Sequence, residues 1–365
     1  MTEARETHAA MHTLHAAHGA RLGPLPEGGS AANRLPLDYG DFAGEVQALR
    51  TEAGLLDLEA CGVIVVRGPD APTFLSGLVT NDVQRLAEGR VQPNLLCGTK
   101  GKILQPLEVV RVKPDQYLLV TAPGGLNAVA AHLESYHVRE AVEIGRVPLL
   151  RLDLIGPATD VALDAVGLST AQPIATYRAA PLLVLAHPLG SLPGAMLLLP
   201  APLAPAWAEA LLQAAPQVRM VGYEAYDEVR IHAGVPRFGV DFDGEHLPAE
   251  AALYDHLSFN KGCYVGQEVH ARLHHRGHVN RKLCALRVPE AQAATLQPGS
   301  PLFADGEEAG RVTSLAREAA DGLRPAVALV RYAPLTAGTA LAVAPDAPAS
   351  IAAGALASDL GVARQ

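Results

Sequence analysis

The stretch Asn260-Lys261-Gly262-Cys263-Tyr264-Val265-Gly266-Gln267-Glu268 places a single thiol between a lysine and two glycines. A cysteine reacts as the thiolate, and the ammonium of Lys261 favours that charged form. Gly262 and Gly266 permit tight turns that would expose the sulfur. The alternative is that Cys263 is a small buried hydrophobe, as many free cysteines are. The polar surroundings favour a reactive thiol, held by a loop that consists of Gly262, Tyr264, Gly266, Gln267 and Glu268.

After this motif, apolar and polar side chains alternate over residues 268–273. A period of two predicts that a half-buried strand begins here and that the cysteine loop leads into a sheet. Four histidines follow closely, at positions 270, 274, 275 and 278, and are the densest group of potential metal ligands. The flanking Arg272, Arg276, Arg281 and Lys282 would repel a cation, so we assign no metal. The basic segment is instead expected to dock an acidic partner, an RNA or a folate polyanion.

Further segments accompany the cysteine motif in a fixed order. They are Gly40–Val46, Arg50–Leu58, Val66–Arg90, Arg230–Pro236 and Leu247–Glu250. Together with Lys-Gly-Cys-Tyr-x-Gly-Gln-Glu, these segments resemble the YgfZ family of folate-binding proteins, which are relatives of the glycine-cleavage T-protein. The resemblance covers most of the chain. It implies an α+β fold, in which two related α+β units surround a central cavity and a small β-barrel follows at the carboxy terminus.

The same resemblance implies a function. The protein would bind tetrahydrofolate or a derivative and would support assembly or repair of iron–sulfur clusters in client enzymes, including those that thiomethylate transfer RNA. Cys263 would hold sulfur, iron or a folate-derived carbon beside the cavity, with Lys261 supporting the thiolate. A lone cysteine supplies one of the roughly four ligands that a cluster needs, so iron–sulfur assembly proteins and client enzymes are the expected partners.

Folate recognition requires a slot for the flat pterin, hydrogen-bond partners for its edge and cations near its glutamate tail. By resemblance, Tyr226 falls where the family places an aromatic ring against the pterin, and Arg230 matches an arginine of T-proteins. Cys61 falls where some relatives carry a tryptophan. Asn81 and Asp82 are expected to line the cavity, although such residues at a helix end commonly cap or turn the backbone.

A T-protein-like aminomethyltransferase, or another one-carbon transferase, is the alternative function. T-proteins carry a Gly-Gly-x-x-Asp-Asp segment whose carboxylate handles the proton in aminomethyl transfer, and Gly101–Pro106 stands in its place here. Gln105 and Pro106 cannot accept a proton as a carboxylate does. An accessory protein is therefore favoured over a turnover enzyme, and a folate-responsive regulator is a third alternative.

Composition narrows the classes of function. The 365-residue chain has a net charge of −9, which argues against direct nucleic-acid binding. Its four scattered cysteines have neither disulfide-scaffold nor zinc spacing, so a reducing cytoplasm is the expected location. No apolar run approaches the roughly 20 residues of a membrane span. Residues 98–102 are rich in glycine and lysine but lack the spacing of a phosphate loop, and they predict a hairpin turn.

The chain is expected to divide into an N-terminal helix and linker (1–33), a first α+β unit (34–148), a second unit with the cysteine loop (149–279) and a β-barrel (280–365). A strand, a Gly-Pro pair and a helix occur over residues 62–78 and again over 150–166, which indicates an internal duplication. Histidines 8, 12, 15 and 18 are interpreted as an incidental surface stripe on the first helix. Asp305-Gly306 predicts a two-residue hairpin turn.

Strands are expected at 62–66, 92–97, 103–112, 117–120, 150–155, 182–186, 195–199, 283–288, 301–304, 308–314, 326–332 and 339–343. Helices are expected at 3–18, 42–56, 70–78, 126–136 and 204–214.

Overall fold

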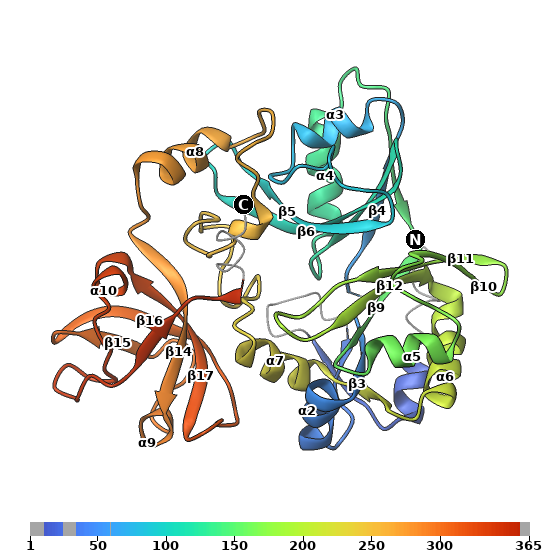
Figure 1. Ribbon diagram of the computed structural model, residues 1–365. Coiled ribbons are helices and arrows are strands. Elements are labelled where there is room, and N and C mark those ends of the chain that lie inside the picture. Colours follow the sequence, from blue (N-terminus) through green and yellow to red (C-terminus); the bar gives the residue numbers. More distant parts are fainter. Residues whose placement is uncertain (1–10, 25–33, 59, 358–365) are drawn as a thin grey trace.

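The computed structural model describes residues 11–24, 34–58 and 60–357 of the chain. Two β-sheets lie one above the other, and a smaller β-domain lies beside them (Figure 1). The first sheet has the strand order β5 (Arg90–Cys97), β6 (Ile103–Lys113), β7 (Gln116–Thr121), β4 (Val63–Arg67) and β8 (Glu143–Val147). The second has the order β10 (Ile174–Tyr177), β11 (Ala180–Ala186), β12 (Gly194–Pro200), β9 (Leu149–Ile155), β3 (Ala53–Asp57) and β13 (Val218–Val221). A separate ribbon contains β1 (Arg21–Pro24) and β2 (Arg34–Asp38).

Residues 11–17 are helical. The further helices of these two sheets and the cysteine loop are α2 (Phe42–Thr51), α3 (Ala71–Ser76), α4 (Leu126–Tyr136), α5 (Thr159–Ala165), η1 (Ala201–Leu203), α6 (Ala204–Ala214), α7 (Tyr223–His232), η2 (Tyr254–His256) and α8 (Gln267–Arg276). Among the helices of the described segments, none combines the length and the apolar character needed to cross a membrane.

One element order is used twice to build the two sheets. The first unit runs β4, α3, β5, β6, β7, α4, β8, and the second runs β9, α5, β10, β11, β12, α6, β13. In both, a three-stranded meander ends beside the opening strand, which gives the orders β5-β6-β7-β4 and β10-β11-β12-β9. The duplication predicted from the sequence is therefore confirmed. Strand β3 breaks the symmetry, because it lies between β9 and β13 although residues 34–57 were expected with the first unit.

The glycine of each Gly-Pro pair makes the turn from strand to helix. Gly68 has a φ of 132° and Gly156 a φ of 133°, a conformation that L side chains rarely adopt. A Cβ atom added at Gly68 would lie under 3.0 Å from the carbonyl oxygen of Ala141, and one at Gly156 would lie as close to that of Glu52. The same strained turn and the same close approach explain why glycine occupies this position twice.

Gly156→Ala is expected to lower the free energy of unfolding by about 3 kcal/mol or more, because backbone strain and overlap with Glu52 act together. Gly167→Ala is the matched control. Gly167 also has a positive φ, of 70°, but an added Cβ would meet nothing within 4 Å. It should cost only about 1 kcal/mol. Urea denaturation measures the loss in the free energy of unfolding for both variants. Equal losses would show that the close approach of the Glu52 carbonyl oxygen does not contribute.

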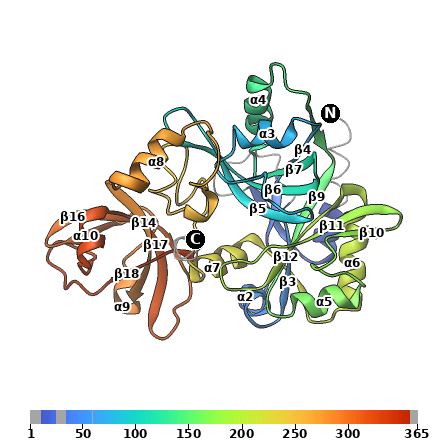
Figure 2. The same cartoon turned by 45° about the horizontal axis from the view of Figure 1, so that its top comes forward.

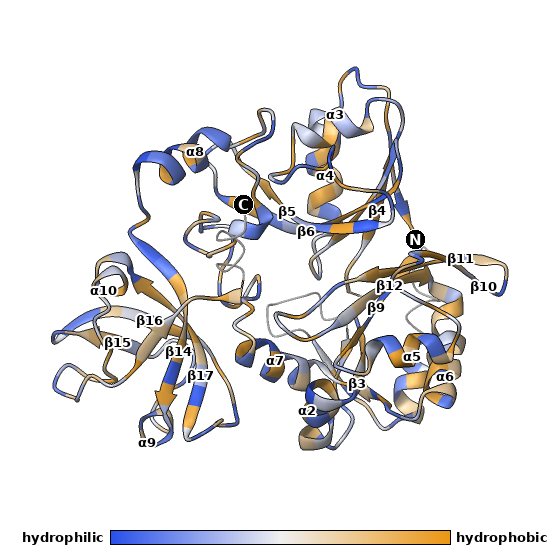
Figure 3. Cartoon of the chain, viewed as in Figure 1, coloured by the Kyte–Doolittle hydropathy of each residue, from blue (hydrophilic) through white to orange (hydrophobic). Residues whose placement is uncertain are grey.

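Both faces of each sheet are buried. In β4, Val63 and Val65 point to the core between the sheets, whereas Ile64 and Val66 pack beneath α3 and α4. A third core lies under α5 and α6 and includes Trp207. The rotated view shows these helices on the outer sides of the two sheets (Figure 2), and the strands between them are largely apolar (Figure 3). A charged side chain on an inner face is therefore exceptional.

The C-terminal part forms a small β-domain. It contains, in sheet order, β15 (Pro301–Ala304), β16 (Glu307–Leu315), β17 (Leu323–Arg331), β14 (Arg281–Pro289) and β18 (Ala352–Gly354), with the short helices α9 (Glu290–Ala293) and α10 (Tyr332–Ala337). Isolated bridges join Phe303 of β15 to Ala342, and Leu341 to Ile351 beside β18. These bridges link the two edges of the sheet and favour the expected barrel. The turn at 305–306 has positive φ at both residues, as predicted.

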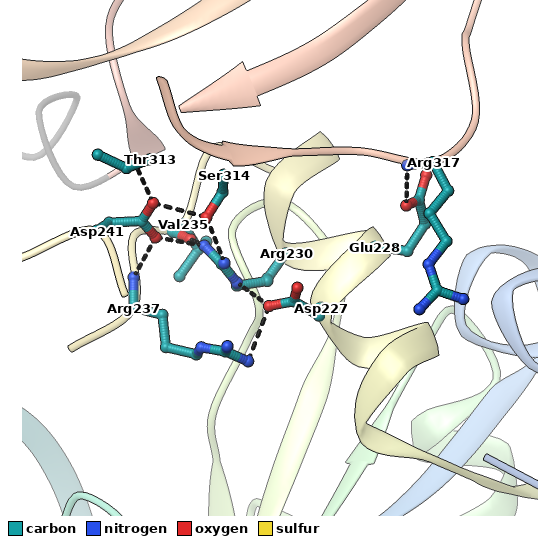
Figure 4. A network of polar contacts seen from close by, with 9 residues as sticks. All are labelled: Asp227, Glu228, Arg230, Val235, Arg237, Asp241, Thr313, Ser314 and Arg317. Atoms are coloured by element: carbon teal, nitrogen blue, oxygen red, sulfur yellow. Dashed lines mark hydrogen bonds and ion pairs between the residues drawn. The ribbon is translucent and has the colours of Figure 1, made fainter. Parts of the chain in front are cut away.

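A buried ion-pair network joins α7 to the β-domain (Figure 4). The guanidinium of Arg230, only 1% exposed, donates to the carboxylate of Asp241 at 2.6 Å and to that of Asp227 at 2.7 Å. It also donates to the hydroxyl of Ser314 on β16 at 2.8 Å. The hydroxyls of Thr313 and Ser314 in turn donate to Asp241. Arg230 therefore fixes the β-domain against the second unit.

Two predictions near the amino terminus are corrected. The helix expected over 42–56 ends at Thr51, because Ala53–Asp57 form β3 inside the second sheet. His15 is not a surface residue: it is buried, its Nε2 donates to Asp57 at 2.8 Å, and its Nδ1 lies 2.8 Å from the hydroxyl of Tyr39. His8 and most of the expected linker lie outside the described residues.

Candidate functional site

A cavity of about 760 Å³ lies between the two sheets. Its walls come from β5, β6 and β7 of the first sheet, β9 of the second, helix α7, and residues within 186–190, 235–242 and 253–256. Ligand pockets in proteins span about 300–1,000 Å³. The central cavity expected from the sequence is thus present, and it is large enough for a small organic molecule.

A row of charged side chains crosses this cavity from one sheet to the other. Arg151 and Asp153 lie on the inner face of β9 and form a bidentate ion pair with distances of 2.8 and 2.6 Å. The Nδ1 atom of His187 lies 3.7 Å from Asp153, and its Nε2 lies 3.4 Å from the carboxylate of Glu108 on β6. The four groups form one row of charged and titratable side chains.

The neighbours of these groups set their charge states. Burial alone would raise the pKa of Glu108, but His187, Arg151 and His256 lower it overall, so Glu108 is a carboxylate at neutral pH. Burial works to lower the pKa of Arg151, and the paired Asp153 carboxylate raises it overall. Burial raises the pKa of the Tyr226 phenol, with a further contribution from Asp153, so this hydroxyl stays protonated and can donate.

A buried amide beside the cavity has no hydrogen-bond partner among the described residues. Gln105 is 6% exposed and lines the cavity, yet its Nε2 makes no hydrogen bond with any described residue. An unpaired buried amide costs free energy, and this nitrogen lies packed beside Gly125 at the start of α4. Gln105 lies on β6, three positions before Glu108, and both residues line the same cavity.

The structure separates the folate contacts predicted from the sequence into two groups. Tyr226 and Cys61 line the cavity, and burial raises the pKa of the Cys61 thiol to about 12, so it stays neutral. Asn81, Asp82 and Arg230 are not among the lining residues. Asn81 instead donates to the carbonyl oxygens of residues 93 and 255, and the donors of Arg230 are engaged in the network of Figure 4.

Sequence reasoning missed the charged row itself. A usable signal was present in Leu149–Ile155, because a strand covered on both faces contains Arg151 and Asp153 at alternate positions. Glu108 interrupts the predicted strand at 103–112 in the same way. His187 follows β11 in a loop and His256 is the last residue of η2, and nothing local marks them as neighbours of that row.

The cysteine motif lies in a separate loop. Cys263 is exposed, but it lines neither the inter-sheet cavity nor the second cavity of the described residues. The strand expected after Glu268 is wrong, because residues 267–276 form helix α8. Val269, His270 and Leu273 form the inner face of this helix, a pattern that a short alternating run cannot distinguish from a strand.

The cysteine loop is seated on the hairpin turn at 98–102. Gly266 has a φ of 86°, and a Cβ atom there would lie 2.7 Å from the carbonyl oxygen of Gly98. The Nε2 atom of His270 donates to the carbonyl oxygen of Gly101 at 2.7 Å, which leaves its Nδ1 to accept from the hydroxyl of Tyr264 at 3.1 Å. The hairpin turn predicted at this position is confirmed, and its role is to support the loop. Gln267 and Glu268 make no side-chain hydrogen bond with the described residues.

Lys261 anchors the other side of the loop. Its Nζ donates to the carbonyl oxygens of Val79 and Asn81, at 2.7 and 2.9 Å, and lies 5.1 Å from the ring centroid of Tyr264. No hydrogen bond or ion pair between Lys261 and Cys263 occurs in the described chain. Burial lowers the pKa of Lys261 to about 8, although Asp82 acts to raise it.

Lys261→Met is therefore expected to change how stability depends on pH. The pKa of about 8 in the folded protein is below the ordinary 10.5, so the unfolded chain binds more protons between these values. Lys261 should therefore contribute up to about 3 kcal/mol to a rise in the free energy of unfolding across this window. Urea denaturation from pH 8 to 10.5 should show a smaller rise in Lys261→Met, whereas the exposed control Lys100→Met should follow the wild type. If the free energy of unfolding of Lys261→Met rises with pH as much as that of the wild type, Lys261 is not the source of this pH dependence.

Two related α+β units around an inter-sheet cavity, followed by a small β-domain, define a mixed α+β protein whose fold matches that of a T-protein structure. Residues 11–188 match the family model described as the GCVT N-terminal domain. The YgfZ family, expected from the cysteine motif, is not distinguished from its relatives by this match and stays a prediction.

Similar proteins cover nearly the whole chain. It is 29% identical to an aminomethyltransferase of Symbiobacterium thermophilum over 325 residues, which are 83% of this chain and 84% of that protein. It is 29% identical to an aminomethyltransferase of Saccharopolyspora erythraea over 360 residues, 94% of each chain. The crystal structure of the glycine cleavage system aminomethyltransferase T from Bartonella henselae matches with a TM-score of 0.80 and 25% identity, covering 96% of this chain and 97% of that one.

Proposed function

We propose that the inter-sheet cavity binds a reduced folate and that the protein is a folate-dependent one-carbon transferase of the aminomethyltransferase type. The observation that carries this proposal is the charged row of Glu108, His187, Asp153 and Arg151 inside a cavity of about 760 Å³. The similarity to aminomethyltransferases along most of the chain favours this function over the accessory role that the cysteine motif predicts.

The cavity residues fit the chemistry of a reduced folate. The hydroxyl of Tyr226 and the carboxylate of Glu108 offer a donor and an acceptor to the edge of a pterin. Tyr223 and Tyr226, whose ring centroids are 5.6 Å apart, offer aromatic surface. Arg237 also lines the cavity and offers a cation for a glutamate tail. When bound, the folate would supply the carrier of the one-carbon unit.

Glu108 replaces the carboxylate that is missing at Gln105 and Pro106. It lies on the same strand and is ionised at neutral pH, so it can accept a proton from a substrate amine in the cavity. His187 is placed to receive or return that proton, since its Nε2 lies 3.4 Å from Glu108. On the other side of the imidazole, Nδ1 lies 3.5 Å from the guanidinium of Arg151, which is itself paired with Asp153.

Two measurements test this proposal together. Calorimetric titration with tetrahydrofolate should show saturable one-to-one binding to the wild-type protein. A turnover assay with tetrahydrofolate and an aminomethylated carrier protein should show transfer of the one-carbon unit. Absence of tetrahydrofolate binding would contradict the whole proposal. Binding without turnover would contradict the proposed transferase activity alone.

The second candidate is the accessory role in iron–sulfur cluster assembly or repair. It is favoured by the exposure of Cys263 on a loop anchored from both sides, and by the lack of acids at positions 105 and 106. Cys263→Ser should then abolish complementation of a strain that lacks this function, while the fold stays intact. Full complementation by Cys263→Ser would exclude a role for the thiol.

A further inference from the structure

A second cavity, of about 500 Å³, lies between α8, the segment 249–259 and the β-domain. Its lining includes three aromatic residues, three histidines and a lysine, which are Tyr254, Phe259, Tyr332, His270, His274, His278 and Lys282. Only 4% of the residues in this chain are aromatic. Three such rings around one cavity are therefore a marked local concentration.

Flat ring pairs form two sides of this cavity. The rings of Phe259 and His274 are stacked with centroids 3.9 Å apart and planes 11° from parallel. Those of His278 and Tyr332 are stacked at 4.7 Å and 2°. Parallel ring pairs present flat faces on which a further planar group can stack.

The charge around the cavity is positive. Residues 267–282 contain Arg272, Arg276, Arg281 and Lys282 against the single acid Glu268, in a chain whose net charge is −9. Arg281 pairs with Glu250 of the facing segment at 3.2 Å, so the excess positive charge comes from Arg272, Arg276 and Lys282. Figure 3 shows α8 as a largely hydrophilic helix. An anionic group is therefore attracted to this rim and repelled by most of the remaining surface.

This cavity is distinct from the one between the sheets. Asp255 and His256 line the inter-sheet cavity, whereas Tyr254 and Leu257 line the second cavity. The segment 253–257 is thus a wall shared by two sites, and a ligand in one does not occupy the other.

We propose that the second cavity binds a flat heterocycle that carries an anionic tail, the chemistry shared by a mononucleotide and a pteroylglutamate. The heterocycle stacks against the rings of Tyr332 and His278. The anionic tail meets Lys282 and the arginines of α8. This site is independent of the proposed one-carbon chemistry.

Calorimetric titration with adenosine 5′-monophosphate, folic acid and inorganic phosphate tests the proposal on the full-length protein. At least one of the two heterocycles should bind with a Kd below about 1 mM, which corresponds to about 4 kcal/mol. Tyr332→Ala and Lys282→Ala should each weaken that binding by about tenfold or more. Tyr332→Phe keeps the ring and should bind as the wild type does.

Two control variants have no part in the cavity. Tyr136→Ala removes an exposed ring from α4, and Lys113→Ala removes an exposed lysine at the end of β6, and both should bind normally. Preference for the nucleotide or for folic acid identifies the source of the ligand. Hydrogen exchange should show protection of residues 267–279 in the complex.

Three results would overturn the proposal. They are the absence of saturable binding by both heterocycles, equal binding in Tyr332→Ala and Lys282→Ala, and protection confined to the walls of the inter-sheet cavity. Tyr332 and Lys282 do not line the inter-sheet cavity, so Tyr332→Ala and Lys282→Ala should keep the wild-type rate of one-carbon transfer, and failure of the folate proposal and failure of this one remain distinguishable.

Discussion

Glu108→Gln is expected to reduce one-carbon transfer by about 10²–10⁴-fold, the usual contribution of a positioned general base. The amide keeps the size and the hydrogen-bonding capacity of the carboxylate but cannot accept a proton. Because the amide side chain would still contact a ligand in the cavity, tetrahydrofolate should bind within a few-fold of the wild type. Steady-state turnover and calorimetric titration of the same preparation measure the two effects.

The pH profile gives an independent check on Glu108. Its pKa is lowered from the ordinary 4.5, so the base form persists at mildly acid pH and the acid limb of kcat should lie below pH 4.5 if Glu108 is the base. Glu134→Gln is the matched control, since Glu134 lies exposed on α4 away from the cavity, and it should leave turnover unchanged. Wild-type turnover in Glu108→Gln would assign the proton to another group.

Arg230→Met is expected to lower the free energy of unfolding by about 3–5 kcal/mol, because it leaves a buried carboxylate without its counter-ion. Asp241 is 0% exposed, and Arg230 is the cation that pairs with it (Figure 4). The contact between the second unit and the β-domain at this network should then be lost. Urea denaturation followed by circular dichroism measures the change.

Two further variants separate charge from packing at this joint. In Arg230→Met combined with Asp241→Asn the buried charge is gone, so part of the lost stability should return. Arg317→Met removes an arginine that is 56% exposed and pairs with Glu224 at the surface, and it should cost under about 1 kcal/mol. If Arg230→Met lowers the free energy of unfolding no more than Arg317→Met does, the buried network does not stabilise the contact between α7 and the β-domain.

The elements predicted best from the sequence are those that local pattern determines. The helices expected at 126–136 and 204–214 have these bounds in the structure. The strands of the first meander, and β11 and β12 of the second, lie where apolar runs and turns placed them, whereas β10 was not predicted. The duplicated Gly-Pro turn was visible because a φ near 130° beside another backbone admits glycine alone. Such signals need no knowledge of distant contacts.

What the sequence could not predict depends on distant contacts. Helix α8 contains the six-residue alternation over 268–273, which is compatible with a strand or with a helix. Its residue His270 contacts Gly101, which lies 169 positions away in the sequence. Glu108 and Arg151 come from different sheets, so only the fold brings them to one cavity. For the same reason Cys263, the most conspicuous residue of the sequence, lies outside the cavity it was expected to adjoin.

The crystal structure of this protein with tetrahydrofolate tests the central claim most directly. The account predicts electron density for the pterin between the sheets, in contact with Gln105, Glu108 and Tyr226. Density for the ligand elsewhere on the protein, with solvent between the sheets, would contradict it.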